Sequence, residues 1–317
     1  MNAGDIAALL ALSGIILYAV FGGADFGGGV WDFFAFGPRA VQQRKAIGAA
    51  MGPVWETNHI WLIFTLVALF TCFPPVFAQL SIHLYAPLSF ALVGIILRGA
   101  AFAFLGPATR DLWVNQIWGK IFGIASLFTP FFFGACAAGV ATGSFHWMGL
   151  FGITVGLFAV ALCAQVAAIF LAAETRDQLE QDFSKRATFA TLSVAAIGLT
   201  ALFAARSSNV PIFDRLTATW PVLGIAMAAG VLILGLLATQ HYRTARVAVG
   251  IEIAAVLCGW FAAQGPLLSH NLSLPSISAP PQTIAVFLWI TAAGFVVLLP
   301  SLWLLFSVFK REALPRS

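Results

Sequence analysis

The sequence predicts an all-α, polytopic membrane protein. Of its 317 residues, 61% are hydrophobic and only 9% are charged, and the mean hydropathy is +0.95. Soluble domains contain about a quarter charged residues, so this composition excludes an ordinary soluble protein. The third observation is the arrangement of the chain, in which long apolar runs alternate with loops too short to form a soluble domain.

About nine apolar stretches are long enough to cross the bilayer core, which takes about 20 residues per helix. They are expected at roughly 6–31, 46–73, 76–104, 116–142, 147–173, 187–205, 219–240, 245–264 and 283–309. Together they form a single integral-membrane domain over residues 1–317, and their number suits two four-helix groups with one peripheral helix. The first stretch lacks the basic region of a cleaved signal peptide and is expected to be retained as a span.

Basic residues in the loops predict the orientation. Thirteen of the sixteen Lys and Arg residues lie in alternate loops and the C-terminal tail, at positions 39, 44, 45, 110, 120, 176, 185, 186, 243, 246, 310, 311 and 316. By the positive-inside rule these segments are cytoplasmic, so the N-terminus lies outside and the C-terminus inside. An odd number of spans, such as nine, likewise places the two termini on opposite sides of the membrane.

The net charge of +4 does not indicate a nucleic-acid partner, because the basic residues are placed where they set membrane topology. The cysteines predict neither a disulfide framework nor a thiolate metal site, since they lie inside apolar runs without C-x-x-C spacing. We interpret them as packing residues: Cys72, Cys136, Cys163 and Cys258.

Two carboxylates lie inside predicted spans, where an ionisable side chain is costly enough to indicate a function. Asp25 lies in the glycine-rich segment GGADFGGG, about 9 Å of helix rise from the cytoplasmic end of the first span. Glu56 lies about 15 Å deep in the second span. Antiparallel neighbouring helices would bring them to overlapping depths, where a carboxyl group can be neutral or charged near neutral pH, as a proton relay requires.

The alternative is a structural pair of acids, satisfied by neighbours such as Asn58, Thr57 or Arg98. Arg98 lies toward the cytoplasmic end of the third span, where it either snorkels to the interface or pairs with a buried carboxylate. Glu252 follows Arg246 by six residues. It is therefore expected within ~10 Å of the inner surface, with its side chain facing that surface.

The histidines do not favour a haem on this chain. A b-type haem needs two imidazoles, or an imidazole and a thioether. His59 and His83 offer one such pair, but nothing repeats at the spacing expected for a haem stack. Trp55 and Trp61 flank Glu56, and some of the tryptophans are expected to anchor the chain at the membrane interface. No metal site is predicted.

These residues also carry a pattern: DFGxG at 25–29, GPVWExNHIWL at 52–62, RG at 98–99 and GWxxxQxP at 259–266. The pattern resembles subunit II of the cytochrome bd-type quinol oxidases. The segment Trp-acid-x-Asn-x-hydrophobic-Trp is its most specific part. Length, number of spans and topology fit the same family from end to end.

The resemblance implies a haem-free subunit II in a respiratory complex of the bacterial inner membrane that oxidises quinol and reduces dioxygen to water. Haems b and d are then expected on the larger subunit I, with which this chain forms a heterodimer, and this chain carries no catalytic residue of its own. The resemblance leaves open a small accessory subunit and a quinone or lipid bound here. It also implies a cytoplasmic proton route through Asp25, Glu56 and Ser126, with polar or packing support from Trp55, Asn58, Trp61 and Arg98.

Two positions depart from the family pattern. Gly22 stands where family members commonly have an acid, and the segment after Arg98-Gly99, which includes Ala103, also lacks one. Protons would then enter through water, through the partner, or by an altogether altered route. Two other functions stay open: a proton-coupled secondary transporter, which would show broken helices in corresponding halves, and a purely structural assembly subunit.

Overall fold

The computed structural model describes residues 2–104, 112–264 and 277–312, and within these ranges the side chains at 51–57, 112–115, 217–218, 302 and 305–312 lie outside the description. The described residues form helices and connecting turns, without a strand. The helices are α1 (Ala3–Phe33), α2 (Ala40–Cys72), α3 (Pro74–His83), α4 (Tyr85–Phe104), α5 (Leu112–Ala141), α6 (Leu150–Glu174), α7 (Asp177–Ser207), α8 (Ile212–Ala218), α9 (Trp220–Ala238), α10 (Tyr242–Gln264) and α12 (Pro281–Glu312).

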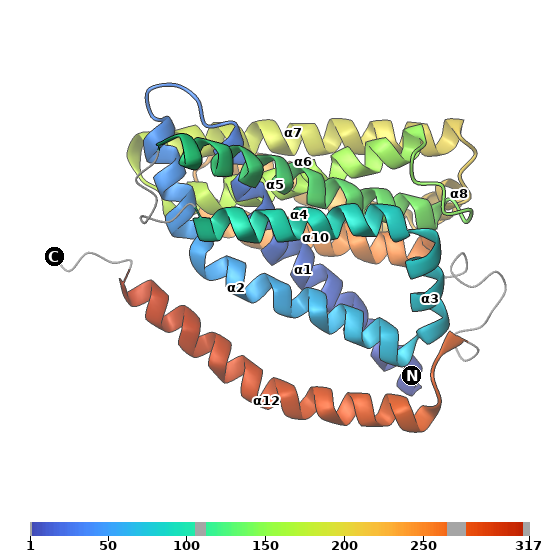
Figure 1. The fold of residues 1–317 in the computed structure, drawn as a ribbon. Helices are drawn as coiled ribbons and strands as arrows, with labels where there is room; N and C mark the ends of the chain where they lie inside the picture. Colours follow the sequence, from blue (N-terminus) through green and yellow to red (C-terminus); the bar gives the residue numbers. More distant parts are fainter. Residues whose placement is uncertain (1, 105–111, 265–276, 313–317) are drawn as a thin grey trace.

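The predicted all-α membrane class is confirmed. In the described part of the chain, eight helices are long and apolar enough to cross a membrane, or up to nine if one bent pair of helices is counted as a span. The helices divide into two four-helix groups, with α1, α2, α4 and α5 in the first and α6, α7, α9 and α10 in the second. Helices α1 and α5 both pack against α6 and so join the two groups (Figure 1).

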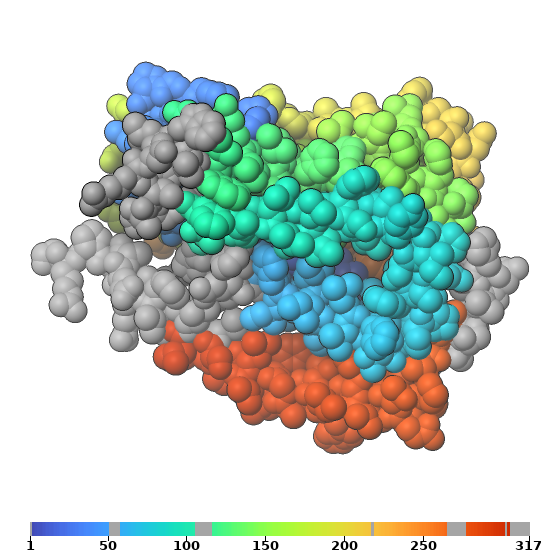
Figure 2. Space-filling view, in the orientation of Figure 1, coloured from blue at the N-terminus to red at the C-terminus, as the bar shows by residue number. Residues whose placement is uncertain are grey.

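Helix α12 is peripheral. Its main contacts are with α2 and α1, and it runs along one edge of the molecule beside α2 (Figures 1 and 2). Its outward side chains are large and apolar, as expected for a helix that faces lipid.

The segment expected as one span at 76–104 is divided at Leu84 into α3 and α4. A sharper break lies just before it. Helix α2 ends at Cys72, and α3 leaves it at an angle of 116°. Pro74 and Pro75 explain this break: proline lacks the backbone N–H that would continue α2, and it disfavours helical dihedrals at the residue before it. Accordingly Phe73 has φ −135° and ψ 55°. The membrane-crossing part of the segment is α4.

One end of the bundle gathers most of the ion pairs. Of the four ion pairs among the described residues, three lie here: Arg39–Asp182 at 2.7 Å, Arg246–Glu174 at 2.7 Å and Arg44–Asp32 at 3.8 Å. They link the α1–α2 loop to α7 and the start of α10 to the end of α6. The start of α1 lies at the opposite end from this cluster and from the end of α12 (Figure 1).

Close packing of α1 on α6 depends on Gly27. A Cβ atom added at Gly27 would collide with the backbone carbonyl of Cys163 and with the Cβ of Ala167. Small residues at such crossings let membrane helices approach closely and gain van der Waals contact. This crossing sets the position of Asp25, which lies two residues away on the same helix.

We expect Gly27→Ala to destabilise the protein by about 1–3 kcal/mol, because the added methyl group meets backbone rather than a side chain that could move. The matched control is Gly235→Ala in α9, where a Cβ has open space and helix propensity favours alanine by up to ~1 kcal/mol. Thermal unfolding in detergent measures both variants. Equal melting temperatures would show that the α1–α6 contact is not tight.

Candidate functional site

A buried ion pair joins the first and third spans. Asp25 is 1% exposed and Arg98 is 2% exposed. The Nη1 and Nη2 atoms of Arg98 donate to Oδ2 and Oδ1 of Asp25, the second bond measuring 2.7 Å. Nη2 also donates to the backbone carbonyl of Asp25 at 2.8 Å. The guanidinium group thus binds its carboxylate through both oxygens, the strongest geometry available to such a pair.

Two further polar side chains complete this site, which we call the Asp25 cluster (Asp25, Asn58, Arg98 and Ser126). Nε of Arg98 donates to Oγ of Ser126 at 2.9 Å, and Ser126 donates to the carbonyl of Phe122 at 2.7 Å. Nδ2 of Asn58 donates to Oδ2 of Asp25 at 2.7 Å. Each of the helices of the first group therefore contributes one member.

Aromatic rings and a glycine enclose the cluster. The guanidinium carbon of Arg98 lies 5.0 Å from the ring centroid of Phe26 and 4.7 Å from that of Phe122, within the range of a cation–π interaction. A Cβ at Gly29 would collide with the Ser126 side chain, so only glycine lets α5 bring this hydroxyl so near to α1. Removal from water strengthens the charge interactions within the site.

The pairing has two consequences. Each charge is compensated, since a lone buried charge in this environment would cost several kcal/mol. Donors hold both carboxylate oxygens of Asp25, so the carboxylate and the guanidinium group form an ion pair of fixed geometry. Of the alternatives that the sequence left open, Arg98 pairs with a buried carboxylate and does not snorkel, and Asp25 is satisfied by Arg98 and Asn58.

The other predicted site residues lie close along α2. The side chains of Trp55 and Glu56 fall outside the described residues, but their backbone is helical. Glu56 precedes Asn58 by two residues, a rise of about 3 Å, so its backbone lies at the level of the Asp25 cluster. Oδ1 of Asn58 is buried, and none of the described residues hydrogen-bonds to it. This acceptor is a place where a water molecule would bind.

The two departures from the family pattern add no acid to this interior. Gly22 is buried against the ring of Tyr18, and Ala103 is exposed on α4. His83 is exposed, with Nδ1 2.9 Å from the carbonyl oxygen of Gln79 and its ring stacked on Phe145. In the part of the chain that is described, no group of three or more His, Cys, Asp or Glu side chains could hold a metal ion.

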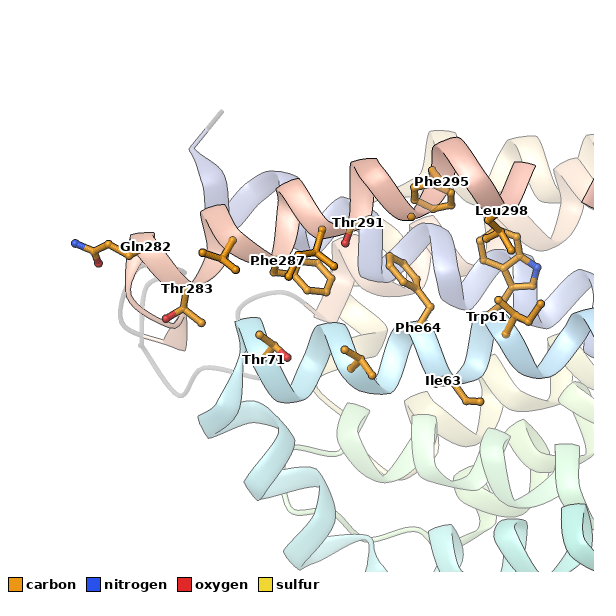
Figure 3. A pocket seen from close by; sticks show the side chains of 15 residues that line it. Trp61, Ile63, Phe64, Thr71, Gln282, Thr283, Phe287, Thr291, Phe295 and Leu298 are labelled. Atoms are coloured by element: carbon orange, nitrogen blue, oxygen red, sulfur yellow. The ribbon is translucent and has the colours of Figure 1, made fainter. Parts of the chain in front are cut away.

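Trp61 lies in an apolar groove of about 800 Å³ between α2 and α12 (Figure 3). Its ring stacks against that of Phe295 with centroids 6.4 Å apart, and Phe64 stacks against Phe287 at 6.1 Å. Figure 3 shows these rings pointing into the space between the two helices. The lining includes Thr71, Gln282 and Thr283 at one end and is otherwise mostly apolar.

A second buried polar group lies among the helices of the second group, and the sequence reading missed it. Nε2 of Gln165 on α6 donates to Oε2 of Glu252 on α10 at 2.8 Å and to Oγ1 of Thr191 on α7 at 3.3 Å. The expectation that Glu252 faces the membrane surface is wrong, because this residue is only 5% exposed. Gln165 was overlooked, although an amide inside an otherwise apolar run was the available signal.

The fold and the two sites define a multi-pass membrane protein with two buried acids in its helical interior. One, Asp25, is in an ion pair with Arg98, and the other, Glu252, is hydrogen-bonded to Gln165. A model of the family "Cytochrome bd terminal oxidase subunit II" matches residues 3–309. The chain belongs to this family.

Individual relatives agree. The chain is 28% identical over 205 residues to cytochrome bd ubiquinol oxidase subunit 2 of Bacillus subtilis, covering 61% of this chain and 60% of that protein. It is 27% identical over 210 residues to cytochrome bd-I ubiquinol oxidase subunit 2 of Escherichia coli K12, covering 61% and 54%. The matches thus span little more than half of these relatives. The fold resembles a chain in the structure of bd oxidase from Geobacillus thermodenitrificans, with a TM-score of 0.80, 20% identity, and coverage of 98% of this chain and 99% of that one.

Proposed function

We propose that this chain is the haem-free subunit II of a quinol:oxygen oxidase, an oxidoreductase complex that reduces dioxygen to water. The observation that carries the proposal is the family match over residues 3–309. In this role the chain is a membrane partner of a haem-bearing subunit I. The redox steps belong to haems b and d of that partner, and this chain contributes protein groups that bind and orient protons.

The proton route that we propose starts at the end of the bundle that holds Arg39, Asp182 and Arg246, and proceeds along α2. Glu56 is its exchangeable carboxyl group, at the level of the Asp25 cluster. The unpartnered Oδ1 of Asn58 supports this route, because it offers a water molecule an acceptor beside Asp25. Asp25 and Ser126 act as the fixed polar wall along which that water is oriented.

We place the chain in the bacterial inner membrane with its N-terminus outside and its C-terminus in the cytoplasm. The gathering of Arg39, Arg44, Arg186 and Arg246 at one end of the bundle supports this orientation, since basic side chains are retained on the cytoplasmic side. The route proposed above then opens toward the cytoplasm.

The transporter alternative is less well supported. It predicts broken helices in corresponding halves of the chain. The described residues contain one sharply bent pair, Asn58–Cys72 with Pro74–His83, in the first four-helix group, and the second group has no counterpart within the described ranges. The assembly-only alternative is tested by the Glu56 variant below.

Purification from native membranes tests the oxidase assignment. We expect this chain, tagged and extracted in mild detergent, to bring with it a haem-bearing subunit that gives visible absorption bands and oxidises quinol. The same preparation, analysed by mass spectrometry, should contain a quinone or lipid, for which the apolar groove between α2 and α12 is our proposed site. Any small accessory subunit would appear in the same spectrum.

The control is the chain expressed without its partner gene, which we expect to be colourless and inactive. Stoichiometric haem on the isolated chain would contradict the haem-free role. A colourless, monodisperse protein from native membranes would contradict the oxidase assignment and favour a transporter.

A further inference from the structure

The carboxyl group of Glu252 lies inside the second four-helix group without a cationic partner. The residue is 5% exposed, and none of the ion pairs among the described residues involves it. A charged carboxylate in such a position is expensive unless it is paired or bound to a cation. The buried carboxylate of Asp25 is paired with the guanidinium group of Arg98, whereas no described cation pairs with Glu252.

The groups that face Glu252 come from three helices. Gln165 of α6 donates to it, Thr191 of α7 touches that amide, and Gly230 of α9 leaves room for the carboxyl group. Helix α9 contains no ionisable residue. Several charged residues of the neighbouring helices are engaged elsewhere: Asp25 of α1 with Arg98, Glu174 of α6 with Arg246 of α10, Asp182 of α7 with Arg39, and Arg186 of α7 with Gln43. The others lie toward helix ends or in the short helix α8: Asp177, Glu180, Lys185 and Arg206 of α7, Arg243 of α10, and Asp214 and Arg215 of α8.

Gln165 supplies the second observation. It is 0% exposed, and its Oε1 atom accepts no hydrogen bond from the residues that the structure describes, whereas its Nε2 atom already donates to Glu252. An unsatisfied buried amide oxygen costs about 1–3 kcal/mol. A carboxylic acid and a primary amide can form two hydrogen bonds, each group donating one. The first is present, and only a protonated Glu252 has the O–H to donate the second to Oε1.

We propose that Glu252 and Gln165 form a proton-binding site in the second four-helix group, separate from the Asp25 cluster. The bound ligand is a single proton on the Glu252 carboxyl group. The site lies at the level of Asp25 but across α6, because Cys163 and Ala167 of α6 meet Gly27 of α1.

The contact between α6 and α10 indicates the end of the bundle at which the proton exchanges with solvent. Glu252 lies six residues, about 9 Å of helix rise, from Arg246, and Gln165 lies nine residues, about 14 Å, from Glu174. Arg246 and Glu174 pair across the same contact at 2.7 Å at the end of the bundle, where both are partly exposed. The proton therefore exchanges with the solvent at that end.

Infrared difference spectroscopy of the purified complex tests the inference. The wild type at neutral pH should show the carbonyl stretch of a protonated carboxyl group, and this band should shift when the sample is transferred to D₂O. Glu252→Gln should remove the band, and Gln165→Leu should move its frequency because the acid loses its amide partner. Glu174→Gln, at the exposed end of the same contact between α6 and α10, is the matched control and should leave it unchanged.

Three results would overturn the proposal. A wild-type minus Glu252→Gln difference spectrum without a protonated-carboxyl band would show that Glu252 is ionised, whatever bands Glu56 or the partner subunit contribute. A band that appears only after Na⁺ and K⁺ are replaced by choline would show that the site binds a metal cation. A band that never shifts in D₂O would show a sealed group without exchange. If Glu252→Gln fails to accumulate, Glu252→Asp should keep the band at a changed frequency, and its absence there counts against the site.

The inference does not rest on the proposed oxidase function, because the spectra report protonation at equilibrium. Loss of the Glu252 band can therefore be observed in a complex whose turnover is unaffected. Conversely, full turnover in Glu56→Gln would contradict the proposed proton route without affecting the proton-binding site at Glu252.

Discussion

Arg98→Met is expected to destabilise the protein by roughly 3–5 kcal/mol, because it leaves Asp25 as an uncompensated charge in the helical interior. The methionine fills much of the volume of the arginine stem, so the loss reports charge more than packing. Assembled complex should decrease in membranes, and the remainder should unfold at a lower temperature in detergent. Haem content and a thermal unfolding curve of the purified complex measure both effects.

The double variant Asp25→Asn with Arg98→Met is the key comparison. Removing both charges should restore a large part of the stability lost in Arg98→Met, since buried ion pairs often exchange for neutral groups at little cost. The surface control is Arg44→Met, which breaks the half-exposed pair with Asp32 and should cost at most about 1 kcal/mol. If Arg98→Met and Arg44→Met unfold alike, the Asp25 cluster does not hold the first four-helix group together.

The two buried acids, Asp25 and Glu252, have different surroundings. Four groups surround the Asp25 carboxylate: a bidentate arginine, an asparagine and two aromatic rings that pack around that arginine. The Glu252 carboxyl group accepts one hydrogen bond, from the side-chain amide of Gln165. The first arrangement favours a permanent ion pair, and the second favours an acid that carries its own proton.

The fold was largely predictable because lipid imposes a simple rule on composition. Every span must be about 20 apolar residues long and helical, so hydropathy alone locates most of the helices. Hydropathy does not report bends, which is why the stretch 76–104 appeared as one span. Pro74 and Pro75 signalled the preceding 116° turn between α2 and α3, but not the break at Leu84 that divides the stretch into α3 and α4.

The sequence predicted how deep the site residues lie in the membrane, but not the direction in which each side chain points around its helix. Counting residues from the loops placed Asp25 near one membrane surface, yet the sequence could not show which neighbour its helix would face. For that reason pairing of Arg98 stayed one of two alternatives, and Glu252 was assigned to the surface. Its burial depends on Gln165, which lies 87 residues earlier in the chain, and on the packing of α6 against α10.

Glu56→Gln is expected to lower oxygen consumption with quinol at least tenfold, because removing a positioned proton donor or acceptor typically costs 10²–10⁴ in rate. Glutamine keeps the size and polarity of the side chain but cannot release a proton. The position lies on α2 at the level of the Asp25 cluster, on the route that we propose from the Arg-rich end of the bundle to the buried oxygen of Asn58. Turnover per haem, with proton uptake recorded in the same sample, measures the effect.

Two controls separate a relay from an assembly role. Glu56→Asp should retain part of the activity, because the carboxyl group is preserved on a shorter arm. Glu174→Gln removes an exposed carboxylate at the same end and should leave turnover unchanged. Normalising to haem removes any loss of assembly from the comparison. Full activity and normal proton uptake in Glu56→Gln would exclude the relay, and the chain would then act as a structural partner whose interior acids hold its helices in place.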